Sequence, residues 1–393
     1  MAYFTTRPET GRHFLHIPGP TNVPDRVLRA LDNPPMDHRG PDFGVMMLQL
    51  FPKLQKLFQT TSHVMVFPGS GTGSWEAALV NTLSPGDRVL FCRTGQFAAS
   101  WIEMAKKLQL NAEIIETDWR HGADIDAISA ALAADTAHSI KAVGVVHSET
   151  STGCVTDIAA VRAAMDAAKH PALLLVDTVS GIGALDYRHD EWGVDVSIAG
   201  SQKGMMMPPG LGFNAVSAKA LEASKSCTMP RAYWHWQPML AINKTGYFPS
   251  TPATNLLYAL DTGLDMLFEE GLDNVFARHD RFAEATRRAV SAWGLETQCA
   301  DPKAASSVVT AVRTPEGHSA DALRRVILEK FDLSLGNGLG QMTDKVFRIA
   351  HLGHLSALQL VGVIGGVEMG MRAAGVPHRE GGVQAAIGYL SGN

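Results

Sequence analysis

A lysine and an aspartate each follow a short apolar run, where a buried strand would present them. Lys203 lies in the segment Ser201–Gly204, after the apolar run Val194–Ala199, and Asp177 directly follows the run Ala172–Val176. The carboxyl ends of parallel strands meet at one edge of a sheet, so both side chains are expected there. A lysine in a dry, cationic pocket can lose its proton and form an imine, and a carboxylate can hold a protonated pyridine nitrogen. The pair predicts a pyridoxal phosphate (PLP) site; the alternative is a surface lysine and an unrelated turn aspartate.

A glycine-rich segment, Gly69–Gly73, follows the apolar run Val64–Phe67 and precedes a helical pattern that opens at Ser74. Glycine allows close approach of the backbone, and the N–H groups of a helix N-terminus bind phosphate. The nearest alternative is the dinucleotide loop of a nicotinamide-dependent oxidoreductase, which requires G-x-G-x-x-G, whereas position 74 is serine. That alternative also leaves Asp177 and Lys203 unexplained. We therefore expect a phosphate-binding loop.

A third polar segment, His147–Gly153, comes directly after the apolar run Ala142–Val146. Its hydroxyl groups could reach a ligand that lies across the strand ends, and the alternative is a Ser/Thr-rich turn. Three consecutive methionines, Met205–Met207, have no His or Cys beside them and are interpreted as part of an apolar pocket, so no metal is expected.

The elements that must position these groups form two patterns. Seven short apolar runs alternate with helical patterns from about residue 64 to residue 216, which predicts an α/β fold with a mostly parallel seven-stranded sheet and helices on both faces. The runs are Val64–Phe67, Arg88–Cys92, Ala112–Glu116, Ile140–Val146, Ala172–Val176, Val194–Ala199 and Leu211–Val216.

After Pro252 the pattern becomes helical, with an apolar face from Leu272 to Trp293. Strands at 307–312 and 346–350, with a capped helix between them, predict a smaller C-terminal α+β domain, and the apolar segment 358–371 is interpreted as a core helix. The expected organisation is an N-terminal arm (1–20), a large PLP-binding domain (21–265) and a small C-terminal domain (266–393).

Composition excludes several classes of function. The 393 residues are 46% hydrophobic, and the net charge of −5 comes from 34 basic and 39 acidic residues without a basic block, so nucleic acid is not an expected partner. Four cysteines without CxxC spacing are expected to be buried free thiols in a reducing compartment. The polar segment 1–10 does not resemble a secretion signal, and 358–371 is too short for a bilayer span of about 20 residues. We expect a cytoplasmic protein without a membrane association.

Taken together, the motifs resemble those of the class V aminotransferases, and most closely the serine–glyoxylate and alanine–glyoxylate branch. The resemblance implies the fold type I of PLP-dependent transferases, with PLP as cofactor, and covers nearly the whole chain. The segments that carry it are Pro18–Asn22, Asp37–Arg39, Gly69–Gly73, His147–Gly153, Val176–Asp177 and Ser201–Lys203.

The resemblance also implies roles for individual residues. Lys203 matches the lysine that bonds to the cofactor and then moves a proton between the substrate and the cofactor, and Asp177 matches the acid that keeps the pyridine nitrogen protonated. Phe97 matches the aromatic residue that stacks on one face of the ring, and Val179 packs on the other face. The remaining cofactor contacts are Ser70, Gly71, Thr72 and Gln202 at the phosphate and Thr150 near the ring oxygen.

Two matched residues imply how the substrate is bound. Arg348 matches the arginine that grips the substrate carboxylate, and its alternative is an ion pair with a local acid such as Asp344. Gly19 matches a substrate-side glycine. A bidentate arginine would fix the substrate's Cα–H bond relative to the ring.

The segment around Thr251 resembles the one through which a partner subunit reaches the cofactor phosphate, which implies a homodimer with shared active sites. Relatives tend to have Tyr-Thr-Pro-Pro here, whereas this chain has Ser-Thr-Pro-Ala at 250–253. Tyr247 or a water molecule is the candidate replacement for the missing tyrosine.

The expected reaction is the transfer of an amino group from a small amino acid, with serine favoured, to glyoxylate, which gives glycine and a 2-oxo acid, hydroxypyruvate in the case of serine. Aspartate, 3-hydroxyaspartate and alanine are alternative donors, and a dicarboxylate would need a second cation, from Arg39 or a partner subunit. A cysteine desulfurase would carry a cysteine just before Arg348, but residues 331–347 contain none. The glycines Gly336, Gly338 and Gly340 in this segment predict that it is a flexible lid over the active site. A non-catalytic scaffold would be expected to lack Lys203 or Arg348, and both are present.

Overall fold

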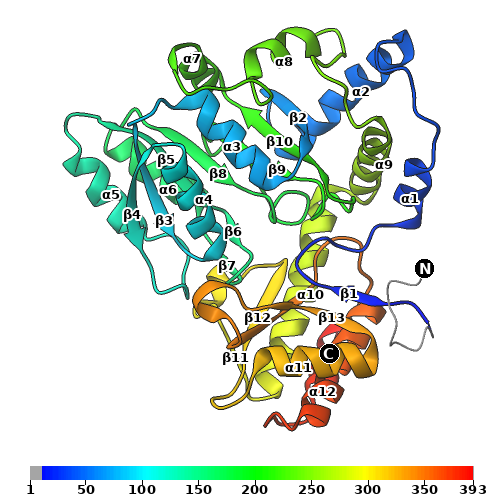
Figure 1. Ribbon diagram of the computed structural model, residues 1–393. Helices are drawn as coiled ribbons and strands as arrows, with labels where there is room; N and C mark the ends of the chain where they lie inside the picture. The colour runs from blue at the N-terminus through cyan, green and yellow to red at the C-terminus, as the bar shows by residue number, and fades with distance from the viewer. Residues whose placement is uncertain (1–10, 393) are drawn as a thin grey trace.

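The computed structural model describes residues 11–392, which are organised around two large hydrophobic cores (Figure 1). The first core holds residues from Val27 to Val275, and the second holds residues from Phe282 to Ala386. The first ten residues of the predicted N-terminal arm lie outside the described residues.

The first core surrounds a seven-stranded sheet with the strand order β2-β10-β9-β8-β5-β3-β4. β10 runs antiparallel to both of its neighbours, and the other neighbouring pairs are parallel. The predicted α/β fold with a mostly parallel seven-stranded sheet is confirmed, and each of the seven apolar runs overlaps one strand. The strands are β2 (His63–Gly69), β3 (Arg88–Arg93), β4 (Asn111–Glu116), β5 (Ile140–Val146), β8 (Leu173–Asp177), β9 (Val196–Gly200) and β10 (Gly210–Val216).

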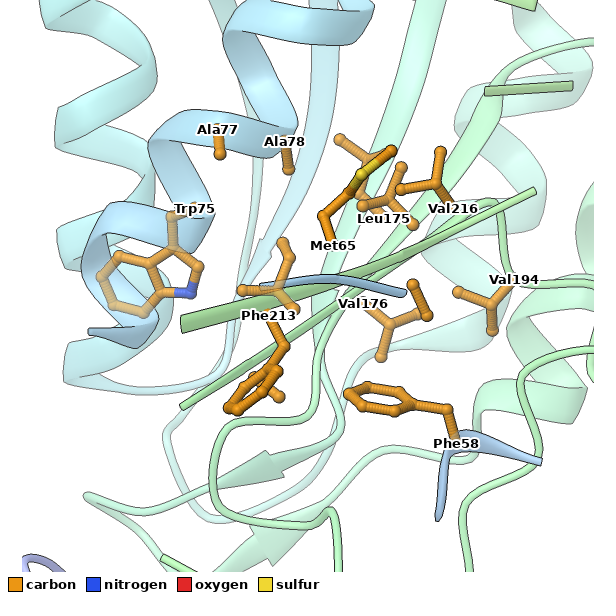
Figure 2. Packing of buried hydrophobic residues seen from close by; sticks show 14 of the residues in the cluster. Phe58, Met65, Trp75, Ala77, Ala78, Leu175, Val176, Val194, Phe213 and Val216 are labelled. Atoms are coloured by element: carbon orange, nitrogen blue, oxygen red, sulfur yellow. The ribbon is translucent and has the colours of Figure 1, made fainter. Parts of the chain in front are cut away.

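Helix α3 (Gly71–Thr82) packs against β9 and β10 of this sheet through small side chains. Figure 2 shows Ala77 and Ala78 of α3 turned toward the strands, with Trp75 on the same helix. Both alanines are fully buried, and side chains of this size let a helix lie close to a sheet. The helices of this part of the chain are α1 (Asp25–Leu31), α2 (Pro41–Phe58), α3 (Gly71–Thr82), α4 (Gln96–Lys107), α5 (Ile125–Ala134), α6 (Ile158–Ala167), α7 (Ala218–Ser226), α8 (Trp236–Asn243) and α9 (Thr254–Glu270).

The second core lies against a five-stranded sheet with the order β1-β13-β14-β12-β11, in the lower part of Figure 1. The predicted long helix from Leu272 and the predicted strand at 346–350 are both present. The strands are β1 (Phe14–His16), β11 (Glu296–Thr297), β12 (Val309–Arg313), β13 (Leu333–Asn337) and β14 (Val346–Ala350). The helices are α10 (Leu272–Ala292), α11 (Ala320–Phe331), α12 (Ala357–Ala374) and α13 (Gly382–Leu390), with short 3₁₀ turns at Pro302–Ala304 and Gly340–Met342, and a two-stranded ribbon, β6 (Ser148–Glu149) and β7 (Cys154–Val155), belongs to neither sheet.

The prediction of a flexible lid over residues 331–347 is wrong for the first part of that segment. Leu333–Asn337 forms β13, which pairs with β1 on one side and with β14 on the other. Leu333 and Leu335 are both buried, as the two-residue period of a strand requires, and this apolar alternation outweighs the flexibility of the nearby glycines.

Within residues 11–392, no helix is both long enough and apolar enough to cross a membrane.

Candidate active site

A cavity of about 270 Å³ lies at the carboxyl edge of the seven-stranded sheet. Asp177 is the last residue of β8, and Lys203 follows the end of β9, as the alternation of strands predicts. The structure brings ten of the predicted site residues together in the lining of this cavity: Gly19, Ser70, Gly71, Thr72, Phe97, Thr150, Asp177, Val179, Gln202 and Lys203.

The Lys203 side chain is buried and reaches across to the N-terminal segment. Its Nζ donates a hydrogen bond to the carbonyl of Pro18. A Cβ on Gly19, which has a φ of +111°, would lie 2.6 Å from Cδ and Cε of Lys203, so only glycine fits there. Burial, and then the positive charge of Arg348, lower the pKa of Lys203 to about 8. Roughly one fifth of this amine would therefore be neutral near pH 7.4, far more than for a lysine with the ordinary pKa of 10.5.

The Asp177 carboxyl group accepts two hydrogen bonds. The indole Nε1 of Trp75 donates to Oδ2 at 3.0 Å, and the backbone N–H of Val179 donates to Oδ1 at 2.8 Å. Burial raises the pKa of Asp177 to about 7, although both hydrogen bonds favour the charged form. A cation placed against this carboxyl group would be stabilised by it.

The amino end of α3 opens into the same cavity. The helix begins at Gly71, before the predicted Ser74, and its N-cap residue Ser70 makes no side-chain capping bond. The first-turn N–H groups of a helix have no partner within the helix, so they are suited to an anion. Gly200 lies so close that a Cβ there would be 3.0 Å from the N atom of Gly71.

The side chains at this end of the cavity also suit a phosphate. The Oε1 atom of Gln202 is buried without a hydrogen-bond partner, and the reversed amide would present its NH₂ group to an anion. Together with the Lys203 amine and the Asp177 carboxyl group, these donors fit PLP. Lys203 would bond to the cofactor, Asp177 would hold its ring nitrogen, and the amino end of α3 would hold its phosphate.

Apolar side chains flank the cavity. The Phe97 ring centroid lies 6.0 Å from Nζ of Lys203. A Cβ on Gly71 would lie 2.5 Å from Cγ2 of Val179, so glycine at position 71 makes room for Val179. The two side chains can hold a planar ring without placing a charge beside it.

Arg348, on β14, is buried and lies behind Thr150 rather than in the cavity lining. Its Nε donates to the carbonyl of Asn337 at 2.8 Å, and its Nη1 donates to the carbonyl of Thr150 at 2.9 Å. Burial lowers the pKa of Arg348 to about 10. Asp344 instead accepts from the backbone N–H of Asp321 at 2.9 Å, and Arg348 donates to backbone carbonyls. Among the described residues, the alternative ion pair between Arg348 and Asp344 is not formed.

Comparison with known proteins decides the family. The model for "Aminotransferase class-V" matches residues 13–350. The chain belongs to this family. The predicted family membership is thereby confirmed, and PLP is the cofactor that the class V aminotransferases imply.

Individual class V relatives cover almost the whole chain. The serine–glyoxylate aminotransferase of Methylorubrum extorquens is 49% identical over 99% of this chain and 98% of its own length. The L-aspartate–glyoxylate aminotransferase of Paracoccus denitrificans is 45% identical over 96% of both chains. Among solved structures, the pyridoxamine–pyruvate aminotransferase of Mesorhizobium loti has a TM-score of 0.91 and 28% identity, over 98% of this chain and 99% of its own.

Three residues named in the sequence analysis lie away from this class V cavity. Thr251 is exposed and does not line it. The Tyr247 hydroxyl donates to the carbonyl of Gly40 at 3.3 Å, within the same chain. Arg39 is exposed and also absent from the lining.

Two side chains beside the site were not predicted from the sequence. Trp75 holds Asp177, and Glu149 is buried beside the cavity. Trp75 was visible only as an apolar residue on a helix. Glu149 lies in the polar segment His147–Gly153. Its acidic side chain among hydroxyl residues is the feature of the sequence that could have identified it.

Proposed function

We propose that the protein transfers the amino group of serine to glyoxylate and so forms hydroxypyruvate and glycine. The observation that carries the proposal is the convergence of the Lys203 amine, the Asp177 carboxyl group and the amino end of α3 on one cavity. Arg348 bonds to the carbonyl of Thr150, which lines that cavity. The similarity to a serine–glyoxylate aminotransferase over nearly the whole length of both chains supports the choice of substrates.

Bound PLP supplies a ring that withdraws electrons from the substrate and makes its Cα–H bond acidic. The Nζ atom of Lys203 would take that proton and would release it again during the transfer of the amino group. A pKa near 8 suits both directions of transfer, because the amine is neither fully protonated nor fully neutral near that pH. The Asp177 carboxylate holds the positive charge at the ring nitrogen.

Arg348 orients the substrate. Its two hydrogen bonds to backbone carbonyls fix the plane of the guanidinium group. A planar guanidinium can bind a carboxylate through two parallel hydrogen bonds, which sets the direction of the Cα–H bond toward Lys203.

Aspartate is the second candidate donor, because an L-aspartate–glyoxylate aminotransferase is 45% identical to this chain. A second carboxylate needs a second cation, and Arg39 is exposed in the single chain. The candidate donors 3-hydroxyaspartate and alanine belong in the same test.

We also propose that the protein is a cytoplasmic homodimer in which Thr251 contacts the cofactor phosphate of the partner subunit. The exposure of Thr251 in the single chain is compatible with such a contact. Sedimentation of the active enzyme tests the dimer, and a fully active monomer at high dilution would contradict it.

The function is tested on the purified, cofactor-loaded enzyme. Each donor is mixed with it separately, and the visible absorbance band is followed by stopped flow before and after glyoxylate is added. Bleaching by serine that glyoxylate reverses is the expected result. Bleaching chiefly by aspartate or 3-hydroxyaspartate would shift the assignment to the second candidate, and the absence of bleaching by any donor would contradict the proposal.

A further inference from the structure

The first turn of α4 is capped by a loop that is distant in sequence. Its N-cap residue, Gly95, has no side chain, and the N–H groups of Gln96–Ala98 donate to side chains of Glu149 and Ser151. The distances are 2.9 Å to Ser151 Oγ, 3.4 Å to Glu149 Oε1 and 3.0 Å to Glu149 Oε2, in chain order. The loop thus satisfies the N–H groups that a helix leaves without partners.

Glu149 is 1% exposed, and its carboxylate accepts four hydrogen bonds. Besides the two N–H groups of α4, its Oε1 accepts from the Ser151 backbone N–H at 3.0 Å and from Ser151 Oγ at 2.6 Å. Among residues 11–392, Glu149 makes no ion pair with a lysine or arginine. Burying a carboxylate without a contacting cation is costly, whereas a serine or aspartate at position 95 would cap α4 at less cost. This arrangement therefore points to a role beyond capping.

Glu149 connects two sides of the cavity. Its carboxylate accepts a hydrogen bond from the backbone N–H of Phe97, and the ring of Phe97 faces Lys203. The next residue in the chain, Thr150, lines the cavity and accepts a hydrogen bond from Arg348 through its carbonyl. The negative charge of Glu149 also acts on both cations, since it raises the pKa of Lys203 and of Arg348 against the effect of burial.

We propose that Glu149 is a positioning residue for the transamination: its carboxylate joins the first turn of α4, which carries Phe97, to the loop that holds Thr150. This inference rests on the proposed function, because it assigns Glu149 a part in the same site. It predicts an effect on the Lys203 nitrogen that a purely structural carboxylate would not have.

The test is Glu149→Gln in the cofactor-loaded enzyme. The pH at which the visible absorbance band changes reports the charge on the Lys203 nitrogen. Removal of the Glu149 charge, which favours the protonated form of that nitrogen, moves this pH down. We expect kcat to fall by about tenfold as the Phe97 side of the cavity loosens, while KM for the amino donor stays within about twofold, because a less negative cavity still binds a carboxylate.

Asp195→Asn is the matched control. Asp195 is also buried and accepts hydrogen bonds from the Leu174 N–H at 2.9 Å and the Ser217 hydroxyl at 2.8 Å, but it does not line the cavity. Unlike Glu149, it also forms an ion pair with Nζ of Lys219 at 3.4 Å. This variant is expected to lower thermal stability and to leave the pH of the band change as in the wild type. An unchanged band pH in Glu149→Gln, or an equal shift in both variants, would overturn the proposal.

Ser151→Ala keeps the test open if Glu149→Gln does not fold. It removes the Ser151 hydroxyl from Glu149 and from Gln96 but keeps the carboxylate, so kcat should fall while the band pH stays unchanged. A wild-type kcat in this variant would contradict the positioning role. The band titration needs only bound cofactor, so it is still informative if serine and glyoxylate prove not to be the substrates.

Discussion

The indole Nε1 of Trp75 donates a 3.0 Å hydrogen bond to Oδ2 of Asp177, from the second turn of α3 to the end of β8. The same helix offers its amino end to the predicted phosphate site. One element therefore positions two parts of the proposed cofactor site, the phosphate end and the carboxyl group for the ring nitrogen. A ligand that spans the cavity is held relative to a single rigid helix, which keeps the predicted contacts in a fixed geometry.

Replacing Trp75 with phenylalanine should lower kcat by about tenfold, because a hydrogen bond to a charged group contributes about 1.5–3 kcal/mol. Since that bond lowers the pKa of Asp177, its loss raises the pKa, and the acidic limb of the kcat profile should move to higher pH. Steady-state kinetics between pH 6 and 9, a range chosen to span the pKa of about 7, measure both effects.

Trp236→Phe is the matched control for Trp75→Phe. Trp236 is fully buried, and its indole nitrogen has no hydrogen-bond partner. This substitution removes similar volume without removing a hydrogen bond, so the pH profile should stay in place. A profile that moves equally in both variants would show that the Trp75 effect comes from packing.

Lys203→Met should abolish turnover and yet stabilise the cofactor-free chain near pH 7. The folded-state pKa of Lys203, about 8, lies below the ordinary value of 10.5, so folding disfavours the charged form. The resulting loss of folding stability is absent above pH 10.5, grows as the pH falls, and reaches its full size below pH 8. The lowering of the Lys203 pKa from 10.5 to about 8 corresponds to a loss of about 3 kcal/mol in the free energy of unfolding.

Urea unfolding of both cofactor-free chains at pH 7 and pH 10 measures this cost. The stability advantage of Lys203→Met should be present at pH 7 and shrink toward pH 10. Lys225→Met is the control, since Lys225 is exposed and forms an ion pair with the exposed Glu222. An advantage that does not change with pH would mean that Lys203 is not desolvated as described.

The sheet and the principal site residues were predictable because their signals are local. Apolar runs followed by Asp177 or Lys203 mark strand ends, and parallel strands deliver such residues to one edge. β13 was missed because its leucines lie among glycines, and its pairing partner β1 is more than 300 residues away in the chain. Trp75 and Glu149 were missed for a similar reason, since their roles arise only from contacts between distant segments.

Arg348→Lys should raise KM for the amino donor by about 10- to 100-fold with a smaller change in kcat. Lysine retains the positive charge but not the planar pair of N–H groups, and it cannot satisfy both the Asn337 and the Thr150 carbonyls. Loss of one or two charged hydrogen bonds corresponds to that range. Steady-state kinetics with serine as the varied substrate measure it, and an unchanged KM would exclude Arg348 from carboxylate binding.

Gly95→Ala should destabilise the enzyme and weaken cofactor retention. An added Cβ would lie 2.4 Å from Glu149 Cγ and 2.5 Å from Ser151 Oγ, so the loop must move away from α4. Such overpacking costs about 1–3 kcal/mol. Thermal unfolding and the cofactor content after dialysis measure the effect.

Gly388→Ala is the control for Gly95→Ala. Gly388 lies in α13 with no atom within 4 Å of its added Cβ, so alanine should be neutral or mildly stabilising there. Equal stability of the two variants would show that α4 and the Glu149 loop are not tightly joined.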